Sequence, residues 1–254
     1  MAIIIKTKEE IEILREGGKR LASVLRKVKE SIVPGISTKE LDKIAFDEIK
    51  SLGDEPAFLN YKPYGADYPY PASLCVSVND EIVHGIPSDR VLKEGDIVSI
   101  DLGLKHKGYF TDHAITVPVG KVSKEDMELL SVGEEALNIG IEAVTVGGRI
   151  GDIGYAIEKY VSEFGFGIVR GLSGHGVGVH IHEDPYVPNY GKKGTGEKIV
   201  PGMVIAIEPM ITAGNPNIKT LKDGYTIVSK DGSRAVHFEH TVAITEDGPE
   251  ILTK

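Results

Sequence analysis

Four acidic side chains stand where the sequence predicts a dry environment. Asp101 and Glu208 each follow an apolar run, IVSI and VIAI, and neither run contains a basic residue. A buried carboxylate is costly unless it is paired or binds a metal, so a salt bridge to a distant lysine or arginine would explain one such acid. Asp112 and Glu239 stand at matching places further along. Four acids brought together would repel one another without cations, and the set therefore favours a metal centre.

Histidines complete this candidate set. His175 lies between glycines in the segment SGHGVG, where the backbone can approach closely, and His182 follows seven residues later. Four carboxylates and one neutral imidazole carry a formal charge of −4, which two divalent ions neutralise. Such an oxygen-rich set suits Mn, Fe(II) or Co and is compatible with Zn. His84, on a turn before the first ligand strand, is a candidate proton or hydrogen-bond donor, although a single loop histidine is more often structural.

Helices and strands alternate along the chain and would position these residues. Thr7, Ser37 and Ser123 each begin a capping-box pattern, and a fourth apolar periodicity covers about residues 150–164. The first three helices are expected from 8 to about 29, from 38 to about 52, and from 124. Residues 53–73 are predicted to be irregular. The predicted strands span residues 74–78, 97–102, 114–119, 203–207, 226–228 and 237–244.

The order of elements indicates an internal repeat. Residues 9–21 align with 125–137 at five identities, and the segment GDIVSID matches GMVIAIE, which ends on Glu208. We therefore predict an α+β protein of two pseudo-symmetric halves, about 1–120 and 121–254, that bring their acids to one centre. Without a linker between them, the halves are expected to form a single domain over 1–254.

Composition excludes several classes of protein. The chain of 254 residues has 41% hydrophobic and 26% charged residues, which is typical of a globular domain, and its apolar runs are too short to span a membrane. Its net charge of −9 argues against nucleic acid as a partner. The single cysteine, Cys75, fits a reducing compartment. We expect a cytoplasmic monomer without a membrane or nucleic-acid partner.

At these residues the chain resembles the type I methionine aminopeptidases, which have the pita-bread fold around a dinuclear metal centre. The resemblance runs from about Thr7 to the C-terminal residues. It rests on the segments VNDEIVHGIP, GDIVSIDLG, TDHA, SGHGVG, HEDP, IEPM and FEHTVAIT, in this order and with matching spacing. Each segment is weak alone, but together they are specific.

The resemblance implies two divalent ions per chain, Co, Mn, Fe(II) or Zn. Asp101 would bind one ion, Asp112 and Glu239 would bridge, and His175 with Glu208 would bind the other. A metal-activated water would then hydrolyse the first peptide bond of a protein or peptide that begins with methionine and has a small second residue.

The resemblance also implies the remaining site residues. Glu208 would act as general acid and base, while His84 and His182 would contact the substrate amide and stabilise the tetrahedral intermediate. The methionine side chain would lie in a pocket of apolar and aromatic residues, namely Tyr70, Cys75, Ile181 and Tyr225. The expected substrates are the N-termini of nascent or newly made proteins, and transient contact with the ribosome is left open.

The chain departs from the family at several positions. Residues 61–71 form a longer segment than usual, Ile181 replaces an expected phenylalanine, Tyr225 replaces a tryptophan, and His113 follows Asp112 where a smaller residue is common. These departures affect the pocket rather than the acids.

Two other functions remain as alternatives. Xaa-Pro aminopeptidases or dipeptidases share the fold and the ligand set, but they usually carry an extra N-terminal domain for which this length leaves no room. A non-catalytic pita-bread binding protein would be expected to lose ligands or to gain a basic surface, and neither is observed here.

Overall fold

Four amphipathic helices form where N-cap residues precede apolar periodicity. The computed structural model describes residues 2–254. Thr7, Ser37 and Ser123 accept hydrogen bonds from the first turns of three helices and complete capping boxes, as predicted. The helices are α1 (Lys8–Glu30), α2 (Thr38–Ser51), α3 (Lys124–Glu142) and α4 (Ile150–Ser162). All four lie within a few residues of their predicted bounds.

The main sheet has nine strands, which come from both halves of the chain. Its strand order is β1-β4-β5-β14-β9-β7-β8, while β2 pairs with β4 and β15 pairs with β14. The strands are β1 (Glu55–Pro56), β2 (Leu74–Val78), β4 (Ile97–His106), β5 (Tyr109–Pro118), β7 (Gly174–Gly176), β8 (Glu183–Val187), β9 (Val204–Ile207), β14 (Glu239–Thr245) and β15 (Gly248–Ile251).

Two small sheets flank the main one. The first has the order β13-β10-β6 and the second β11-β12-β3. Their strands are β3 (Glu81–Val83), β6 (Gly167–Ile168), β10 (Met210–Thr212), β11 (Ile218–Thr220), β12 (Ile227–Ser229) and β13 (Ala235–His237). Most of these strands have only two or three residues, too few for an alternating pattern to reveal them in the sequence.

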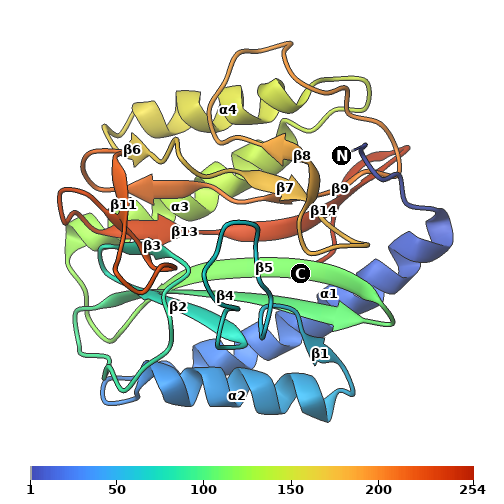
Figure 1. Cartoon of the computed structure of the whole chain (residues 1–254). Helices are drawn as coiled ribbons and strands as arrows, with labels where there is room; N and C mark the ends of the chain where they lie inside the picture. Colours follow the sequence, from blue (N-terminus) through green and yellow to red (C-terminus); the bar gives the residue numbers. More distant parts are fainter. Residues whose placement is uncertain (1) are drawn as a thin grey trace.

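Each helix pair covers its own part of the sheet. α1 packs against β4 and β5, and the buried faces of α1 and α2 share an apolar cluster with β2, β4 and β5. The buried faces of α3 and α4 form a second cluster with β9 and β14. Figure 1 shows α1 and α2 below the curved sheet and α3 and α4 above it. The face of the sheet away from the helices is left free for a cavity.

The hairpin of β4 and β5 corrects two predicted strand bounds. The strand predicted over 97–102 runs on to His106, and the strand predicted from 114 begins at Tyr109. Lys107 and Gly108, with φ of 47° and 90°, form the tight turn between them. The polar segment KHKG resembles a loop, so the sequence hides these strand ends. Asp101 and Asp112 consequently lie inside paired strands rather than at their ends.

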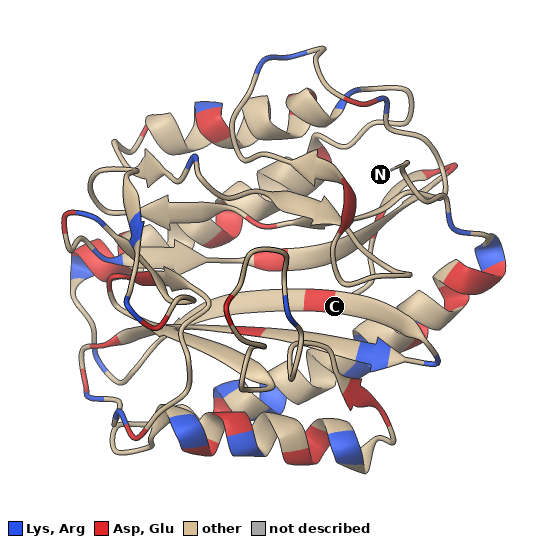
Figure 2. Ribbon diagram, in the orientation of Figure 1, with Lys and Arg blue, Asp and Glu red and all other residues tan. Residues whose placement is uncertain are grey.

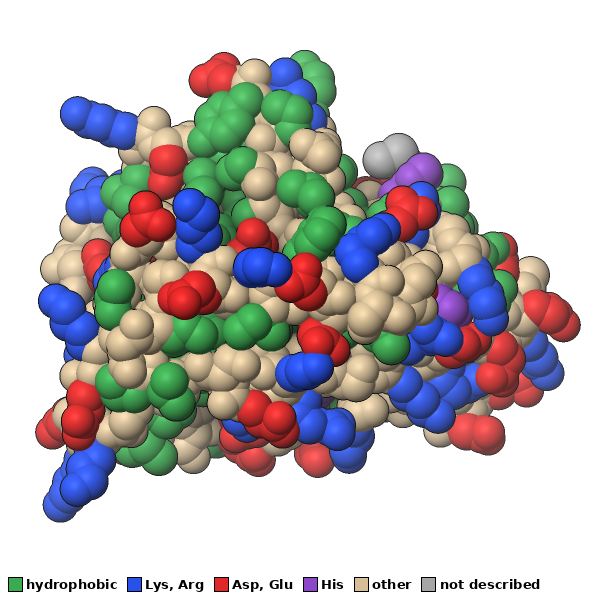
Figure 3. Space-filling model, turned by 90° about the horizontal axis from the view of Figure 1, so that it is seen from below, with side chains coloured by type: hydrophobic (Ala, Val, Ile, Leu, Met, Phe, Trp, Pro, Cys, Tyr) green, Lys and Arg blue, Asp and Glu red, His purple; other side chains and the backbone are tan. Residues whose placement is uncertain are grey.

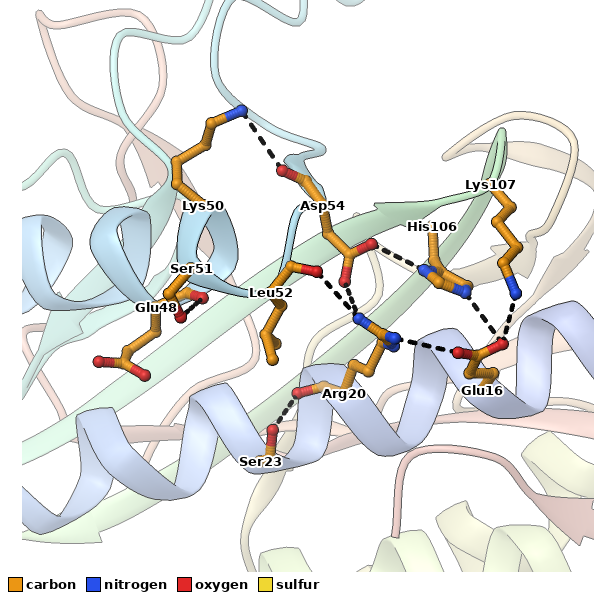
Figure 4. A network of polar contacts seen from close by, with 10 residues as sticks. All are labelled: Glu16, Arg20, Ser23, Glu48, Lys50, Ser51, Leu52, Asp54, His106 and Lys107. Carbon is orange, nitrogen blue, oxygen red and sulfur yellow. Dashed lines mark hydrogen bonds and ion pairs between the residues drawn. The ribbon is translucent and has the colours of Figure 1, made fainter.

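A polar network fixes this hairpin to α1. Arg20 lies 3.0 Å from Glu16 Oε1 and 3.3 Å from Asp54 Oδ2, and His106 Nδ1 lies 2.7 Å from Asp54 Oδ1. Lys107 Nζ lies 2.7 Å from Glu16 Oε2 (Figure 4). Asp54 and His106 are buried. Every acid of this network therefore has a basic partner.

Charges of both signs mix on the outer surface. Figure 2 shows basic segments mainly on the helices and connecting loops, whereas the central strands carry acidic segments. Seen from below, from the side on which α2 lies, lysines and arginines alternate with acids (Figure 3). Within residues 2–254, none of the helices is long and apolar enough to cross a membrane.

Candidate metal centre

Strand register brings the predicted acids onto one face of the sheet. Cys75 in β2 pairs with Asp101 in β4, Asp101 pairs with Ala114 in β5, and Ala114 pairs with Glu239 in β14. Residues directly opposite one another on neighbouring strands point to the same face. Glu208 follows β9 beside this row, because Ile207 pairs with His240, the neighbour of Glu239.

Asp112 joins the row diagonally. It pairs with Gly103, two residues beyond Asp101 and hence on the same face, and its side chain is hydrogen-bonded to that of Asp101. His113, the next residue, faces the opposite side, where its ring stacks on that of His240 at 4.5 Å.

His175 reaches the acids from β7, on the far side of β9. A Cβ on Gly174 would lie 2.3 Å from Ala206 O, and one on Gly176 would lie 2.2 Å from Asp184 O, so both neighbours must be glycine. His175 Nδ1 lies 2.9 Å from Gly176 O. A carbonyl oxygen only accepts, so Nδ1 carries the proton and Nε2 presents a lone pair. Nε2 lies 3.4 Å from Glu208 Oε1.

The electrostatics of the cluster are those of acids without a counter-charge. Burial raises the pKa of Asp112 to about 7. Burial, followed by the charges of neighbouring acids, raises the pKa values of Asp101, Glu208 and Glu239 well above their ordinary range. Burial lowers the pKa of His175 to about 3, so its ring is neutral at physiological pH. Burial and mutual repulsion therefore favour the protonated forms of these carboxyl groups in the metal-free protein.

The donor set fits divalent metal ions. One ligand atom each from Asp112, His175 and Glu239 lies within 4.8 Å of the other two. Asp101 Oδ1 and Glu239 Oε1 are buried and have no hydrogen-bond partner in the described part of the chain. The side chains lining the surrounding cavity of about 490 Å³ include no lysine or arginine among the residues described. Hard oxygen donors and one imidazole, without a basic partner, are suited to cations such as Mn²⁺, Fe²⁺, Co²⁺ or Zn²⁺.

Two further predicted histidines line the same cavity. His84 follows β3 with φ 60°, a left-handed conformation that is uncommon for residues other than glycine. His182 stands at the mouth, 4.5 Å from the His175 ring between centroids, and its Nδ1 lies 2.9 Å from Tyr61 Oη.

The predicted pocket residues are only partly at the cavity. Tyr70, Cys75 and Tyr225 line it. The rings of Tyr70 and Tyr225 meet edge to face at 5.2 Å, and burial keeps the Cys75 thiol neutral by raising its pKa. Ile181 is buried in the same apolar cluster but is not among the lining residues.

Comparison with known proteins identifies the family of this chain. The model of metallopeptidase family M24 matches residues 12–246. The methionine aminopeptidase 1 of Bacillus subtilis is 50% identical over 252 residues, covering 99% of both chains. The chain belongs to metallopeptidase family M24.

Solved structures of M24 proteins separate two groups of relatives. The crystal structure of a methionine aminopeptidase from Thermotoga maritima covers both chains completely, at 44% identity and a TM-score of 0.95. The prolidase from Pyrococcus furiosus is 28% identical with a TM-score of 0.78, and the match covers 99% of this chain but 65% of the prolidase. The predicted pita-bread fold of an M24 metallopeptidase is thereby confirmed.

One residue at the M24 centre was missed by the sequence analysis. His237 lines the cavity, is 1% exposed, and places Nε2 3.3 Å from Glu208 Oε2. Burial lowers its pKa to about 3. Its position two residues before Glu239 was the available signal, since residues i and i+2 of an extended segment share a face. Tyr61, the partner of His182, was missed because it belongs to the irregular segment 53–73.

Proposed function

We propose that this M24 protein is a methionine aminopeptidase, which removes N-terminal methionine when the second residue is small. The buried cluster of acids and His175 at the cavity supports metal-dependent hydrolysis, which Xaa-Pro enzymes share. The single observation that carries the methionine assignment is the full-length identity of 50% to a methionine aminopeptidase. A prolidase function is less supported, since the prolidase match is lower in identity and extends over only part of that protein.

We propose for the five ligands the roles that the family resemblance implies, and the clustering of Asp112, His175 and Glu239 supports them. Asp101 would hold one ion, His175 and Glu208 the other, and Asp112 and Glu239, in the middle strands β5 and β14, would reach both. Two bound divalent ions supply a water of lowered pKa and polarise the scissile carbonyl.

The chain's own residues then carry out positioning and proton transfer. Glu208 would take the proton of the attacking water and pass it to the leaving amine. His84 and His182 would donate hydrogen bonds to the substrate amide, where negative charge develops in the transition state. Tyr70, Cys75 and Tyr225 would surround the methionine side chain, with Ile181 in the same apolar cluster, and a thioether packs well against such aromatic and sulfur surfaces.

The setting of the reaction is also a proposal. We propose a cytoplasmic monomer that acts on newly made N-termini, with transient contact to the ribosome. The free, buried Cys75 supports a reducing compartment. We further propose that residues 1–254 form one catalytic domain derived from two halves, supported by the places of β4–β5 and β9–β14 on either side of the sheet's centre.

A peptide panel tests the function. The protein is loaded with Mn²⁺, Fe²⁺, Co²⁺ or Zn²⁺ and given Met-Ala-Ser, Lys-Ala-Ser, Ala-Pro-Ala and formyl-Met-Ala-Ser at equal concentration. We expect cleavage of Met-Ala-Ser alone, because the pocket suits methionine and the family needs a free amine. The Asp112→Asn protein serves as control for contaminating peptidases. Preference for Ala-Pro-Ala would replace the proposal by an Xaa-Pro activity.

A further inference from the structure

His237 is a second imidazole at the acidic cluster, and it lies at the short connection between β13 and β14. It ends β13, and Glu239 begins β14 two residues later. A Cβ added to Gly133 of α3 would lie 2.7 Å from Val236 Cγ2 and 2.8 Å from Phe238 Cε2, so these two side chains pack under α3. Alternation therefore turns His237 and Glu239 together toward the cavity.

The ring nitrogens of His237 are buried without a hydrogen-bond partner in the described part of the chain. Nε2 lies 3.3 Å from Glu208 Oε2 and 4.0 Å from Glu239 Oε2. A polar group in such a place costs free energy, so its position beside two acids of the cluster needs an explanation. The ring is therefore placed for an interaction at the metal centre rather than for packing.

Two imidazoles flank the Glu208 carboxylate, one on each oxygen. His175 Nε2 lies 3.4 Å from Oε1, and His237 Nε2 lies 3.3 Å from Oε2. The backbone fixes His175 with its Nε2 lone pair toward the cluster, because Nδ1 donates to Gly176 O. No carbonyl fixes His237 in this way within the described chain, so its single proton can stand on Nε2.

The surroundings of Nδ1 decide which ring nitrogen of neutral His237 carries the proton. If Nε2 were a metal ligand, Nδ1 would carry the proton and would be a buried donor without an acceptor. With the proton on Nε2, Nδ1 is an unpaired acceptor, and buried unpaired acceptors are tolerated more often than donors.

We propose that His237 is a positioning residue whose Nε2–H, 3.3 Å from Glu208 Oε2, donates to this oxygen after a small rotation of either side chain, which leaves Oε1, on the side of His175, to face a metal ion. The inference rests on the proposed function, since it assigns Glu208 its place in that site. Second-layer hydrogen bonds of this kind orient ligands and are needed for full metal affinity.

Two substitutions test the proposal without relying on activity. His237→Leu removes the donor at similar volume, and His237→Gln returns an amide N–H that can reach the place of Nε2. Cobalt(II) titration of the metal-free proteins, followed by calorimetry and visible absorption, gives the dissociation constants and the ligand field. We expect His237→Leu to bind about 10–100-fold more weakly, and His237→Gln to stay within about threefold of the parent with an unchanged spectrum.

Peptide hydrolysis adds a second measurement. With saturating metal, His237→Leu should lose kcat against Met-Ala-Ser with little change in KM, because the ring contacts Glu208 and not the methionine pocket. His106→Gln, the same change at a buried histidine far from the cavity, should leave the metal titration unaltered. The thermal transition of each metal-free protein checks that it is folded.

Two results would overturn the inference. Parental cobalt affinity in His237→Leu would remove His237 from the centre. Equal weakening and a changed spectrum in both variants would make His237 a ligand instead of a donor. The titration contains no peptide, so loss of the methionine assignment alone would leave its outcome intact.

Discussion

Two groups of acids in this molecule have opposite surroundings. In the network between α1 and the β4–β5 hairpin, Glu16 is partly exposed and receives hydrogen bonds from Lys107, His106 and Arg20, which lower its pKa to about 2. In the cavity, burial raises the pKa of Asp112 to about 7. The same chemical group is thus held as an anion in one place and pushed toward its protonated form in the other.

The difference identifies the part of the molecule that needs an external cation. The network of Figure 4 is complete, because Arg20 and Lys107 come from the chain itself. The four acids of the cluster come from three strands, β4, β5 and β14, and from the end of a fourth, β9, and no lysine or arginine of the described chain lines the cavity. The first arrangement stabilises the fold. The second destabilises the metal-free fold but holds the side chains of a functional centre.

The largest expected effect comes from Asp112→Asn. Removing a carboxylate that reaches both ions should lower the rate on Met-Ala-Ser by on the order of 10³-fold, since metal stabilisation of the transition state is worth several kcal/mol. The metal-free variant should melt at a higher temperature than the parent, because burial of an ionisable carboxyl group with a raised pKa costs stability at neutral pH and a neutral amide avoids that cost. Steady-state kinetics measures the loss of rate, and calorimetry measures the change in melting temperature. A lower melting temperature would mean that Asp112 is a stabilising partner, like Asp54.

Metal affinity should depend steeply on pH. The acids of the cavity have raised pKa values, with Asp112 at about 7, so each ion must displace protons, and affinity falls as the pH drops below 7. The expected change is about tenfold per pH unit for each displaced proton. His175, with its pKa near 3, is already neutral and releases none. Titration calorimetry at pH 6 in buffers of different ionisation enthalpy measures the release, and a value of zero contradicts the protonated cluster.

Asp54→Asn tests the polar network between α1 and the β4–β5 hairpin. It breaks the contacts to Arg20 and His106 and should reduce the free energy of unfolding by about 1–3 kcal/mol, less than for a fully buried pair because Arg20 is partly exposed. Metal affinity should not change, since none of the network lines the cavity. Urea unfolding and a cobalt titration separate the two quantities. Equal loss of both would show that the regions are coupled.

A smaller effect is expected at the mouth of the cavity. Tyr61→Phe removes the hydroxyl 2.9 Å from His182 Nδ1 and leaves the ring in place. The loss of one hydrogen bond, about 1 kcal/mol, corresponds to roughly a fivefold lower kcat/KM for Met-Ala-Ser. Tyr64→Phe, at a fully exposed side chain, is the matched control. If both variants behave alike, His182 is not oriented by Tyr61.

The sequence predicts the helices and the acids well, for local reasons. Capping boxes at Thr7, Ser37 and Ser123 depend on residues three apart, and all three are present in the structure. Asp101 and Glu208 are conspicuous because each interrupts an apolar run, and burial of neighbouring residues is a property that such runs predict well.

Features that depend on distant pairing are less accessible from the sequence. The β4–β5 hairpin continues through polar residues, because pairing between the strands, not apolar alternation, sustains them up to Lys107. The predicted strand over 237–244 contains His237, but the contact of its ring with Glu208 depends on packing between distant segments, which the sequence does not reveal. The place of Ile181 in the apolar cluster and outside the cavity lining likewise depends on packing between separate segments.

Anomalous diffraction from crystals of the manganese-loaded protein tests the central claim most directly. Two peaks are expected, one beside Asp101 and one between His175 and Glu208, with Asp112 and Glu239 contacting both. Asp112→Asn crystals grown in the same way should show weaker peaks at both places. Fully loaded crystals without a peak at these carboxylates would contradict the account, because the buried acids would then need another explanation.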